Sequence, residues 1–174
     1  CLTIDDNFFD SEPFPEWTKG MDIIPLSQTL KMQGDDHKIF APLSARNMNK
    51  DREDLFNRLK AQGFRFYSYI SSNAKNYGTV GDNCFILENN LIQPFTTIED
   101  NVVLWSGNHI GHHSSIGKNT MITSHVVISG NCSVGRNCFF GVNASVKDNT
   151  SIADSVFVSM GACVNKNIHE EGAV

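Results

Sequence analysis

A period of six residues runs through the second half of the chain and constrains its fold more than any other feature. Steps of six from Val80 to Val164 meet a large apolar residue every time. Because 40% of the chain is hydrophobic, chance gives such a run in a fixed phase only about once in a million. The residues of the series are Val80, Ile86, Ile92, Ile98, Leu104, Ile110, Ile116, Ile122, Ile128, Val134, Phe140, Val146, Ile152, Val158 and Val164.

Residues that tolerate positive φ repeat at the same interval, three positions after the apolar residue. Most of them are Asn or Gly, which enter the left-handed αL region at the lowest cost. They are Asn83, Asn89, Asn101, Gly107, Asn119, Asn131, Asn137, Asn143, Asn149, Gly161 and Asn167. The repeat therefore predicts one buried aliphatic side chain and one corner in each hexad.

This pattern predicts a β-solenoid. Each hexad forms a short strand and a corner, and three hexads close one triangular coil. Residue i then stacks on residue i+18 at about 4.8 Å, the spacing of paired strands. The hexads from Val80 to Val164 make about five coils, and the ends of such an array need caps.

The residues before the repeat have a different pattern, which predicts a strand–helix–strand unit of a parallel sheet. In the helix, Asn49 is the expected cap, Leu55, Phe56 and Leu59 form an apolar stripe, and Gly63 ends the helix. The expected elements are a short helix within 25–32, a strand at 38–44, a helix at 49–63 and a strand at 64–70.

Composition narrows the functional classes. The net charge of −5, the pI near 5.6 and the lack of a basic run argue against nucleic-acid binding. No stretch approaches the roughly 18 apolar residues of a membrane span, and no signal peptide is evident. The five cysteines contain no CxxC, so neither a disulfide framework nor a zinc site is indicated, and a reducing cytoplasm is expected. The chain begins at Cys1 rather than Met, so we expect further residues upstream.

Three histidines in GNHIGHHSSIGKN (107–119) are the first candidates for chemistry. His113 and His125 fall at the corner position of their hexads, where His is one of the tolerated residues. His112 falls one position earlier, at a place that is otherwise variable and mostly polar, so it should point outward. Gly130 is its neighbour in the next coil and leaves space beside the imidazole.

Both parts of the chain together resemble the hexapeptide-repeat sugar acyltransferases, which include sialic-acid O-acetyltransferases and acetyltransferases of nucleotide-linked amino sugars. The resemblance implies a left-handed parallel β-helix at 79–168 and, before the junction at Tyr77–Gly78, a Rossmann-like α/β nucleotide-sugar-binding portion at 1–76 whose first strand is missing. The motifs that carry it are ILENNLIQPF (86–95), LWSGNHIGHHSSIG (104–117), SHVVISGNC (124–132) and GVNAS (141–145).

The same resemblance implies a mechanism. His112 maps onto the family's catalytic histidine, and an imidazole accepts a proton at neutral pH. The sugar amine or hydroxyl would attack the acetyl-CoA thioester directly, with a backbone N–H near Gly130 stabilising the oxyanion. Relatives often have Asp or Glu after the catalytic histidine, whereas this chain has His113. Asn108, Glu88 or a backbone carbonyl are therefore the expected orienting groups.

The resemblance also implies ligands and an assembly. Acetyl-CoA would lie in a groove between two subunits of a homotrimer, and a nucleotide-linked sugar used for surface polysaccharide or glycan would be the acceptor. N- and O-acetylation both remain open. The expected cofactor-binding residues are Gly130, Asn131, Gly141, Val142, Met160 and Gly161, and the expected substrate-binding residues are Asp5, Asp6, Glu88, Asn108, His109 and His113.

Two other functions remain as alternatives. One is a catalytically silent β-helix scaffold. The other is a metal-dependent hydratase like the hexapeptide-repeat carbonic anhydrases, in which two of the three metal-binding histidines are five positions apart. No two histidines of this chain have that spacing, so no metal is expected.

Overall fold

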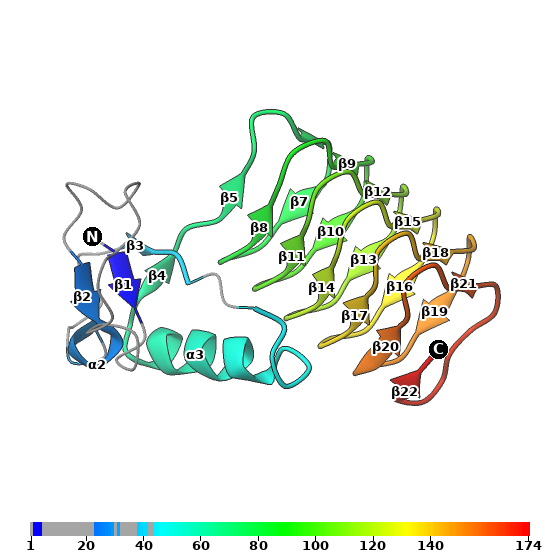
Figure 1. The fold of residues 1–174 in the computed structure, drawn as a ribbon. Helices are drawn as coiled ribbons and strands as arrows, with labels where there is room; N and C mark the ends of the chain where they lie inside the picture. Colours follow the sequence, from blue (N-terminus) through cyan, green and yellow to red (C-terminus); the bar gives the residue numbers. More distant parts are fainter. Residues whose placement is uncertain (1, 5–22, 30, 32–37, 42–43) are drawn as a thin grey trace.

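The computed structural model describes residues 2–4, 23–29, 31, 38–41 and 44–174, and its main body is a parallel β-solenoid of about six turns (Figure 1). The expected stacking is confirmed within the repeat, because its strands pair in parallel with a register of eighteen residues, as Ile110 does with Ile128 and Leu104 with Ile122. The coils at the two ends pair with a register of sixteen, as Ile70 does with Ile86 and Phe157 with Ala173. The repeat therefore becomes a prism with three faces, each of them one parallel sheet.

The three faces differ in length. The first has seven strands: β5 (Tyr69–Ile70), β8 (Phe85–Ile86), β11 (Val103–Leu104), β14 (Met121–Ile122), β17 (Phe139–Phe140), β20 (Val156–Val158) and β22 (Gly172–Ala173). The second has six: β6 (Lys75–Asn76), β9 (Leu91–Ile92), β12 (His109–Ile110), β15 (Val127–Ile128), β18 (Ser145–Val146) and β21 (Cys163–Val164). The third has five: β7 (Thr79–Val80), β10 (Thr97–Ile98), β13 (Ser115–Ile116), β16 (Ser133–Val134) and β19 (Ser151–Ile152).

The aliphatic series fills the inside of the prism. Its members from Ile86 to Val164 are buried, and only Val80, in the first coil, is partly exposed. The paired strands begin before the repeat does, because β5 and β6 already pair with β8 and β9 ahead of Tyr77–Gly78. The solenoid is therefore longer than the roughly five coils that the sequence repeat predicts.

The corners have the backbone conformation that the sequence predicts. Every corner position from Asn83 to Gly161 has positive φ, including those occupied by Phe95, His113, His125 and Ser155. Asn167 is the exception, and its side-chain oxygen instead accepts a hydrogen bond from the Ser151 N–H, at 2.9 Å.

The N-terminal part contains the expected strand–helix–strand unit. Strands β3 (Lys38–Ile39) and β4 (Arg65–Phe66) pair in parallel, with helix α3 (Lys50–Ala61) between them in sequence. The stripe of Leu55, Phe56 and Leu59 is buried in a second small core. Strand β1 (Leu2–Ile4) pairs in parallel with β2 (Ile23–Pro25), and the short helix α2 (Leu26–Thr29) follows. No helix in the described part of the chain combines the length and hydropathy of a transmembrane span.

The start of α3 corrects one expectation. Asn49 has a left-handed backbone, with φ of 65°, and makes no side-chain cap. Its Nδ2 instead donates to the carbonyl oxygen of Cys138 in the solenoid, at 3.0 Å. The end of the helix follows the expectation, since Gly63 has a φ of 86° and the Phe64 N–H bonds to the carbonyl of Leu59.

Helix α3 lies along one corner of the prism, which we call the asparagine corner: Asn83, Asn101, Asn119 and Asn137. Asn83 donates to the side-chain oxygen of Asn101, which donates to that of Asn119, both at 2.8 Å. The buried Arg52 of α3 donates to the backbone carbonyl of Asn119. Hydrogen bonds between side chain and backbone thus hold the helix on the solenoid.

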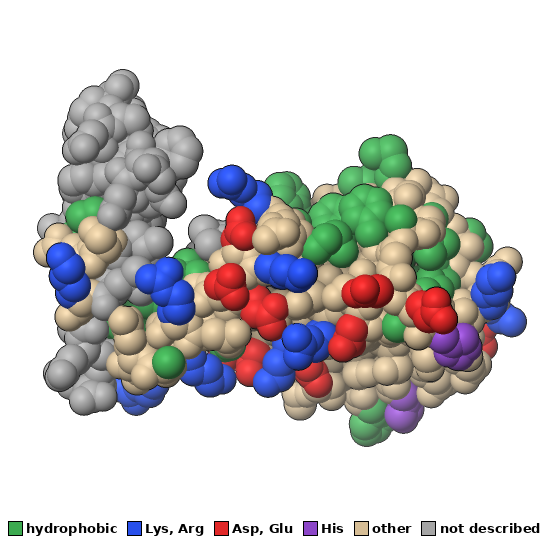
Figure 2. Space-filling view, turned by 90° about the horizontal axis from the view of Figure 1, so that it is seen from below, with side chains coloured by type: hydrophobic (Ala, Val, Ile, Leu, Met, Phe, Trp, Pro, Cys, Tyr) green, Lys and Arg blue, Asp and Glu red, His purple; other side chains and the backbone are tan. Residues whose placement is uncertain are grey.

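Ion pairs surround this contact, and Figure 2 shows cationic and anionic side chains mixed on this side of the molecule. Lys60 of α3 and Lys118 of the solenoid both approach Asp100, at 3.5 and 3.3 Å. Burial acts to raise the pKa of Asp100, but the Asp82 N–H and the Lys118 ammonium outweigh it and hold this pKa below its usual value.

Candidate active site

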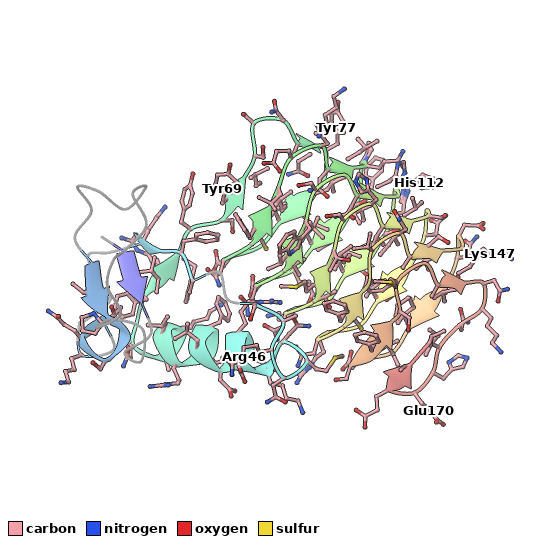
Figure 3. All side chains as sticks on the ribbon, viewed as in Figure 1. Arg46, Tyr69, Tyr77, His112, Lys147 and Glu170 are labelled. Atoms are coloured by element: carbon pink, nitrogen blue, oxygen red, sulfur yellow. The ribbon has the colours of Figure 1, made fainter. Side chains whose placement is uncertain are left out.

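His112 lies on an exposed corner of the solenoid, between β12 and β13, on the side away from α3 (Figure 3). The register brings its imidazole over Gly130 of the next coil. A Cβ atom at Gly130 would lie 2.7 Å from Cε1 and 2.8 Å from Nε2 of His112. Any other residue at position 130 would therefore displace the imidazole.

The backbone N–H of Gly130 is a free donor beside this ring. At the same position of four other hexads the N–H group bonds to a side chain, as His112 N–H does to Gln93 Oε1, at 2.9 Å, and Arg136 N–H to Asp154 Oδ1, also at 2.9 Å, whereas at Ser124 and Asp148 it has no acceptor among the described residues. Nothing within the described residues accepts a hydrogen bond from the Gly130 N–H. The corner therefore holds an imidazole and an unused donor in adjacent coils.

His113 is the side chain that contacts His112. The two Nδ1 atoms are 3.1 Å apart, and the rings stand at 85° to each other. His113 has the left-handed backbone of a corner, with φ of 57°. Its other face stacks on Phe95 of the preceding coil, with ring centroids 4.7 Å apart and planes inclined by 29°.

The two side chains expected to orient His112 are bonded elsewhere. Asn108 is buried, and it donates to the carbonyl of Trp105 and accepts from the N–H of Val126. Glu88 is on a different corner, where it accepts a hydrogen bond from the Ser106 hydroxyl at 2.8 Å. The Glu88 backbone N–H and that hydroxyl lower the pKa of the carboxyl. Sequence reasoning did not identify His113 as the contact of His112.

His109 and His125, the other two histidines between Val80 and Val164, lie apart from this pair. His109 is half-buried in β12, between Leu91 and Val127 of the neighbouring coils. His125 forms a corner with φ of 59°, and its imidazole lies against Gly107. His125 thus resembles His113 in its backbone but has no histidine beside it in the preceding position.

The expected cofactor-binding residues fall on two corners of the chain. Gly130 and Asn131 are on the corner of His112, whereas Gly141, Val142, Met160 and Gly161 are on the corner between the first and second faces. Gly141 is also required by packing, because a Cβ there would collide with the backbone of Met160. Asp5 and Asp6 lie outside the described residues.

Two hollows of about 300 and 390 Å³ open beside the asparagine corner, and neither includes His112. Lys118 and Asp100 line both of them, and the larger one also touches α3. In the part of the chain that the structure describes, no three His, Cys, Asp or Glu side chains converge as metal ligands would.

The repeat segment matches two family models. Residues 95–130 match the Bacterial transferase hexapeptide (six repeats), and residues 131–166 match the Hexapeptide repeat of succinyl-transferase. A search of curated proteins by sequence gave no match.

Solved structures share the fold at low identity. The acetyltransferase domain of PglB from Neisseria gonorrhoeae FA1090 in complex with acetyl coenzyme A has a TM-score of 0.82 and 18% identity, over 95% of this chain and 80% of that one. PerB from Caulobacter crescentus in complex with CoA and GDP-perosamine has a TM-score of 0.70 and 21% identity, over 72% and 61%. WeeI from Acinetobacter baumannii AYE has a TM-score of 0.59 and 19% identity, over 97% and 80%.

Proposed function

We propose that this chain, which belongs to the hexapeptide-repeat acyltransferases, transfers an acetyl group from acetyl-CoA to a nucleotide-linked sugar with His112 as general base. The position of the His112 imidazole over Gly130 is the observation that carries the proposal. The structures similar in fold support the choice of ligands, since that of PglB contains acetyl coenzyme A and that of PerB contains CoA and GDP-perosamine.

The proposed chemistry needs only this corner and the two substrates. The acceptor amine or hydroxyl of the sugar attacks the thioester carbonyl, and Nε2 of His112 takes its proton. The C–S bond then breaks, and the sulfur leaves with the bonding electrons and receives a proton. The free N–H of Gly130 donates to the oxyanion of the tetrahedral intermediate, where a charge-assisted hydrogen bond is strongest.

The distribution of the expected cofactor residues supports a site between subunits. The His112 corner is convex, and the corner with Val142 and Met160 is exposed on the other side of the second face. Trp105 and Val127 are also exposed, at 48% and 43%. In the proposed homotrimer these surfaces meet, so that acetyl-CoA lies between His112 of one subunit and Val142 and Met160 of the next.

The N-terminal part completes the proposal. We assign nucleotide binding to the part of residues 1–76 that precedes β5, with a Rossmann-like arrangement and with Asp5 and Asp6 at the nucleotide. We assign acetyl transfer to the solenoid, predicted at 79–168 and extended by β5 and β6, with a left-handed coil. Because α3 docks on the asparagine corner and His112 stands on another, a sugar held by this part would reach the base of a neighbouring subunit. Glu88 and His109 remain proposed contacts of the sugar, whereas the buried Asn108 is out of its reach.

The test is a screen of nucleotide-activated amino sugars and hydroxyl sugars with acetyl-CoA, followed by release of free thiol. His112→Ala should lower kcat at least 100-fold, the usual lower bound for loss of a general base. His125→Asn is the matched control, because it removes a corner histidine and keeps a residue suited to positive φ. It should retain wild-type activity.

Two results would contradict the proposal. If His112→Ala keeps more than about a tenth of the wild-type kcat, His112 is not the base. If the protein binds CoA in calorimetry but acetylates no sugar, the scaffold alternative is favoured. Zinc bound at one equivalent and needed for turnover would instead favour the hydratase.

A further inference from the structure

The contact between His112 and His113 links the proton positions on the two rings, so that only two arrangements are possible. The two Nδ1 atoms are 3.1 Å apart, a distance at which one must donate and the other accept. If His113 donates, the proton of neutral His112 sits on Nε2, and that nitrogen is no base. If His112 donates, its Nε2 carries the lone pair and lies beside Gly130.

We propose that His113 is the positioning residue of this site. Its Nδ1 accepts the Nδ1–H of His112 and leaves Nε2 of His112 unprotonated over Gly130. The inference rests on the proposed function, which requires a lone pair at Nε2. The orienting group is thus a neutral imidazole and not a carboxylate.

No carboxylate of the described residues forms a hydrogen bond or ion pair with either imidazole. Backbone N–H groups of the two histidines bond to Gln93 Oε1 and the Pro94 carbonyl, and the His112 carbonyl accepts from the Asn131 N–H. Neither imidazole takes part in an ion pair with any described residue. The next residue along the His112 row is Gly130, which does not titrate.

Phe95 is the other contact of the His113 ring. It stands at the corner position of its hexad, has the positive φ (63°) that all corners from Asn83 to Gly161 share, and is 76% exposed. Its ring stacks on that of His113, with centroids 4.7 Å apart and planes inclined by 29°. This stacking restricts rotation of the His113 imidazole, whose Nδ1 contacts His112.

Two substitutions at one position separate the hydrogen bond from the backbone. His113→Asn keeps the preference for a corner and carries Oδ1 at the branch position of Nδ1, so it retains an acceptor. His113→Gly keeps the corner equally well, as Gly107 and Gly161 show, and removes the acceptor. We expect His113→Gly to lower kcat by about tenfold or more, as loss of an orienting partner does, with KM for acetyl-CoA unchanged. His113→Asn should restore most of kcat.

Nitrogen-15 NMR of the imidazole rings is the direct readout and needs no turnover. In the wild type, His112 should show a protonated Nδ1 and an unprotonated Nε2, and the pattern should persist in His113→Asn and be lost in His113→Gly. His125→Gly, the same change at the other histidine corner, should alter neither kcat nor the His112 signals. Phe95→Asn keeps a residue suited to the corner but removes the stacking on His113. In this variant the proton of His112 should be divided between Nδ1 and Nε2.

The outcomes distinguish this inference from the proposed function. A proton on Nε2 of neutral His112 in the wild type, or an unchanged kcat in His113→Gly, overturns the positioning role. Full activity of His112→Ala overturns the catalytic role of His112 even where the NMR pattern is as expected. If His113→Gly proves unstable, the wild-type spectrum and His113→Asn still decide the matter.

Discussion

At the scale of single residues, the position of a residue within the six-residue repeat predicts its backbone conformation better than its residue type does. Phe95 and Ser155 are poor candidates for positive φ by themselves, yet both adopt it because their neighbours along the corner do. The same phase explains why Glu88 does not orient His112. Glu88 occupies the equivalent place in its own hexad, but that hexad turns a different corner. The position of Glu88 within the repeat is therefore sufficient to exclude its contact with His112.

The contact between the rings of His112 and His113 could not be predicted from the sequence. Adjacent residues in a chain more often point apart than together, and only the left-handed backbone at His113 turns its ring toward that of His112. The resemblance to relatives with an acid at this position instead directed attention to other polar residues. A departure from a family pattern was therefore the clue, although its meaning required side-chain geometry.

Asn101 allows the two contributions of a corner asparagine to be measured separately. It is fully buried, with φ of 61°, and it links Asn83 to Asn119. Asn101→Ala should destabilise the solenoid by about 3 kcal/mol, from two hydrogen bonds and the left-handed backbone. Asn101→Gly should cost about 1 kcal/mol less, because Gly adopts this φ freely. Urea unfolding at neutral pH measures both.

Asn143→Ala is the control, because this corner is exposed, its side chain has no hydrogen bond to the described residues, and it should show only the cost of the left-handed backbone, about 1 kcal/mol. Equal losses for Asn101→Ala and Asn101→Gly would mean that backbone strain has no part in selecting asparagine at these corners.

At the scale of elements, α3 was predicted well in position and poorly in its contacts. Its bounds and its stripe of Leu55, Phe56 and Leu59 follow from local signals. Asn49 was expected to cap the helix, and no sequence pattern singled out Arg52, but both are buried against the solenoid. Their partners, Cys138 and Asn119, are far away in sequence, so no local sequence pattern predicts these contacts.

Arg52 should be replaceable by an apolar residue. It is 1% exposed, and its Nε and Nη1 atoms have no partner among the described residues. Burial lowers its pKa to about 10. Removing an incompletely paired buried charge is often neutral or stabilising by about 1–4 kcal/mol. We therefore expect Arg52→Met to unfold in urea at or above the wild-type midpoint at pH 7.

The pH dependence of the free energy of unfolding provides a second test of the Arg52→Met prediction. Because the pKa of Arg52 in the folded state is below that in the unfolded chain, burying the charge destabilises the fold fully below about pH 10 and less as the pH rises further. The advantage of Arg52→Met should accordingly shrink in strongly alkaline buffer. Arg58→Met, at an exposed position of α3, should change stability little at either pH. A clear loss of stability in Arg52→Met at pH 7 would show that the bond to Asn119 outweighs desolvation.

At the scale of the whole molecule, one cooperative core runs through the prism and contains three of the cysteines. Cys84, Cys132 and Cys138 are buried, whereas Cys163 is exposed. Each of these three stands four positions after an apolar residue of the repeat, a place from which the sequence alone does not show how strongly a thiol is shielded. Burial raises the pKa of Cys84 and of Cys138 to about 11, and it also raises the pKa of Cys132.

Thiol labelling should therefore report opening of the solenoid. In a Cys1→Ser background, a disulfide reagent at pH 8 should modify Cys163 at once, and the three core thiols only on unfolding. A thiol whose pKa is raised by folding stabilises the fold below its unfolded pKa, and this contribution is lost as the pH rises toward the folded value, about 11. The urea concentration at the midpoint of unfolding should therefore decrease as the pH is raised from 8 to 10.5. Rapid labelling of Cys84 in native buffer would contradict a closed core.

The pairing of His112 with Gly130 also sets a rule for changes in chain length. Exposed corners usually accept insertions and deletions easily, but between these two residues a single added or lost residue would shift every later residue by one place along the perimeter. Deleting one residue there would bring Asn131 beneath the imidazole and move the aliphatic residues off the interior. Between these two residues only a whole lap of eighteen can be gained or lost without disturbing the rest, whereas the terminal coils pair over sixteen residues, as Ile70 does with Ile86 and Phe157 with Ala173.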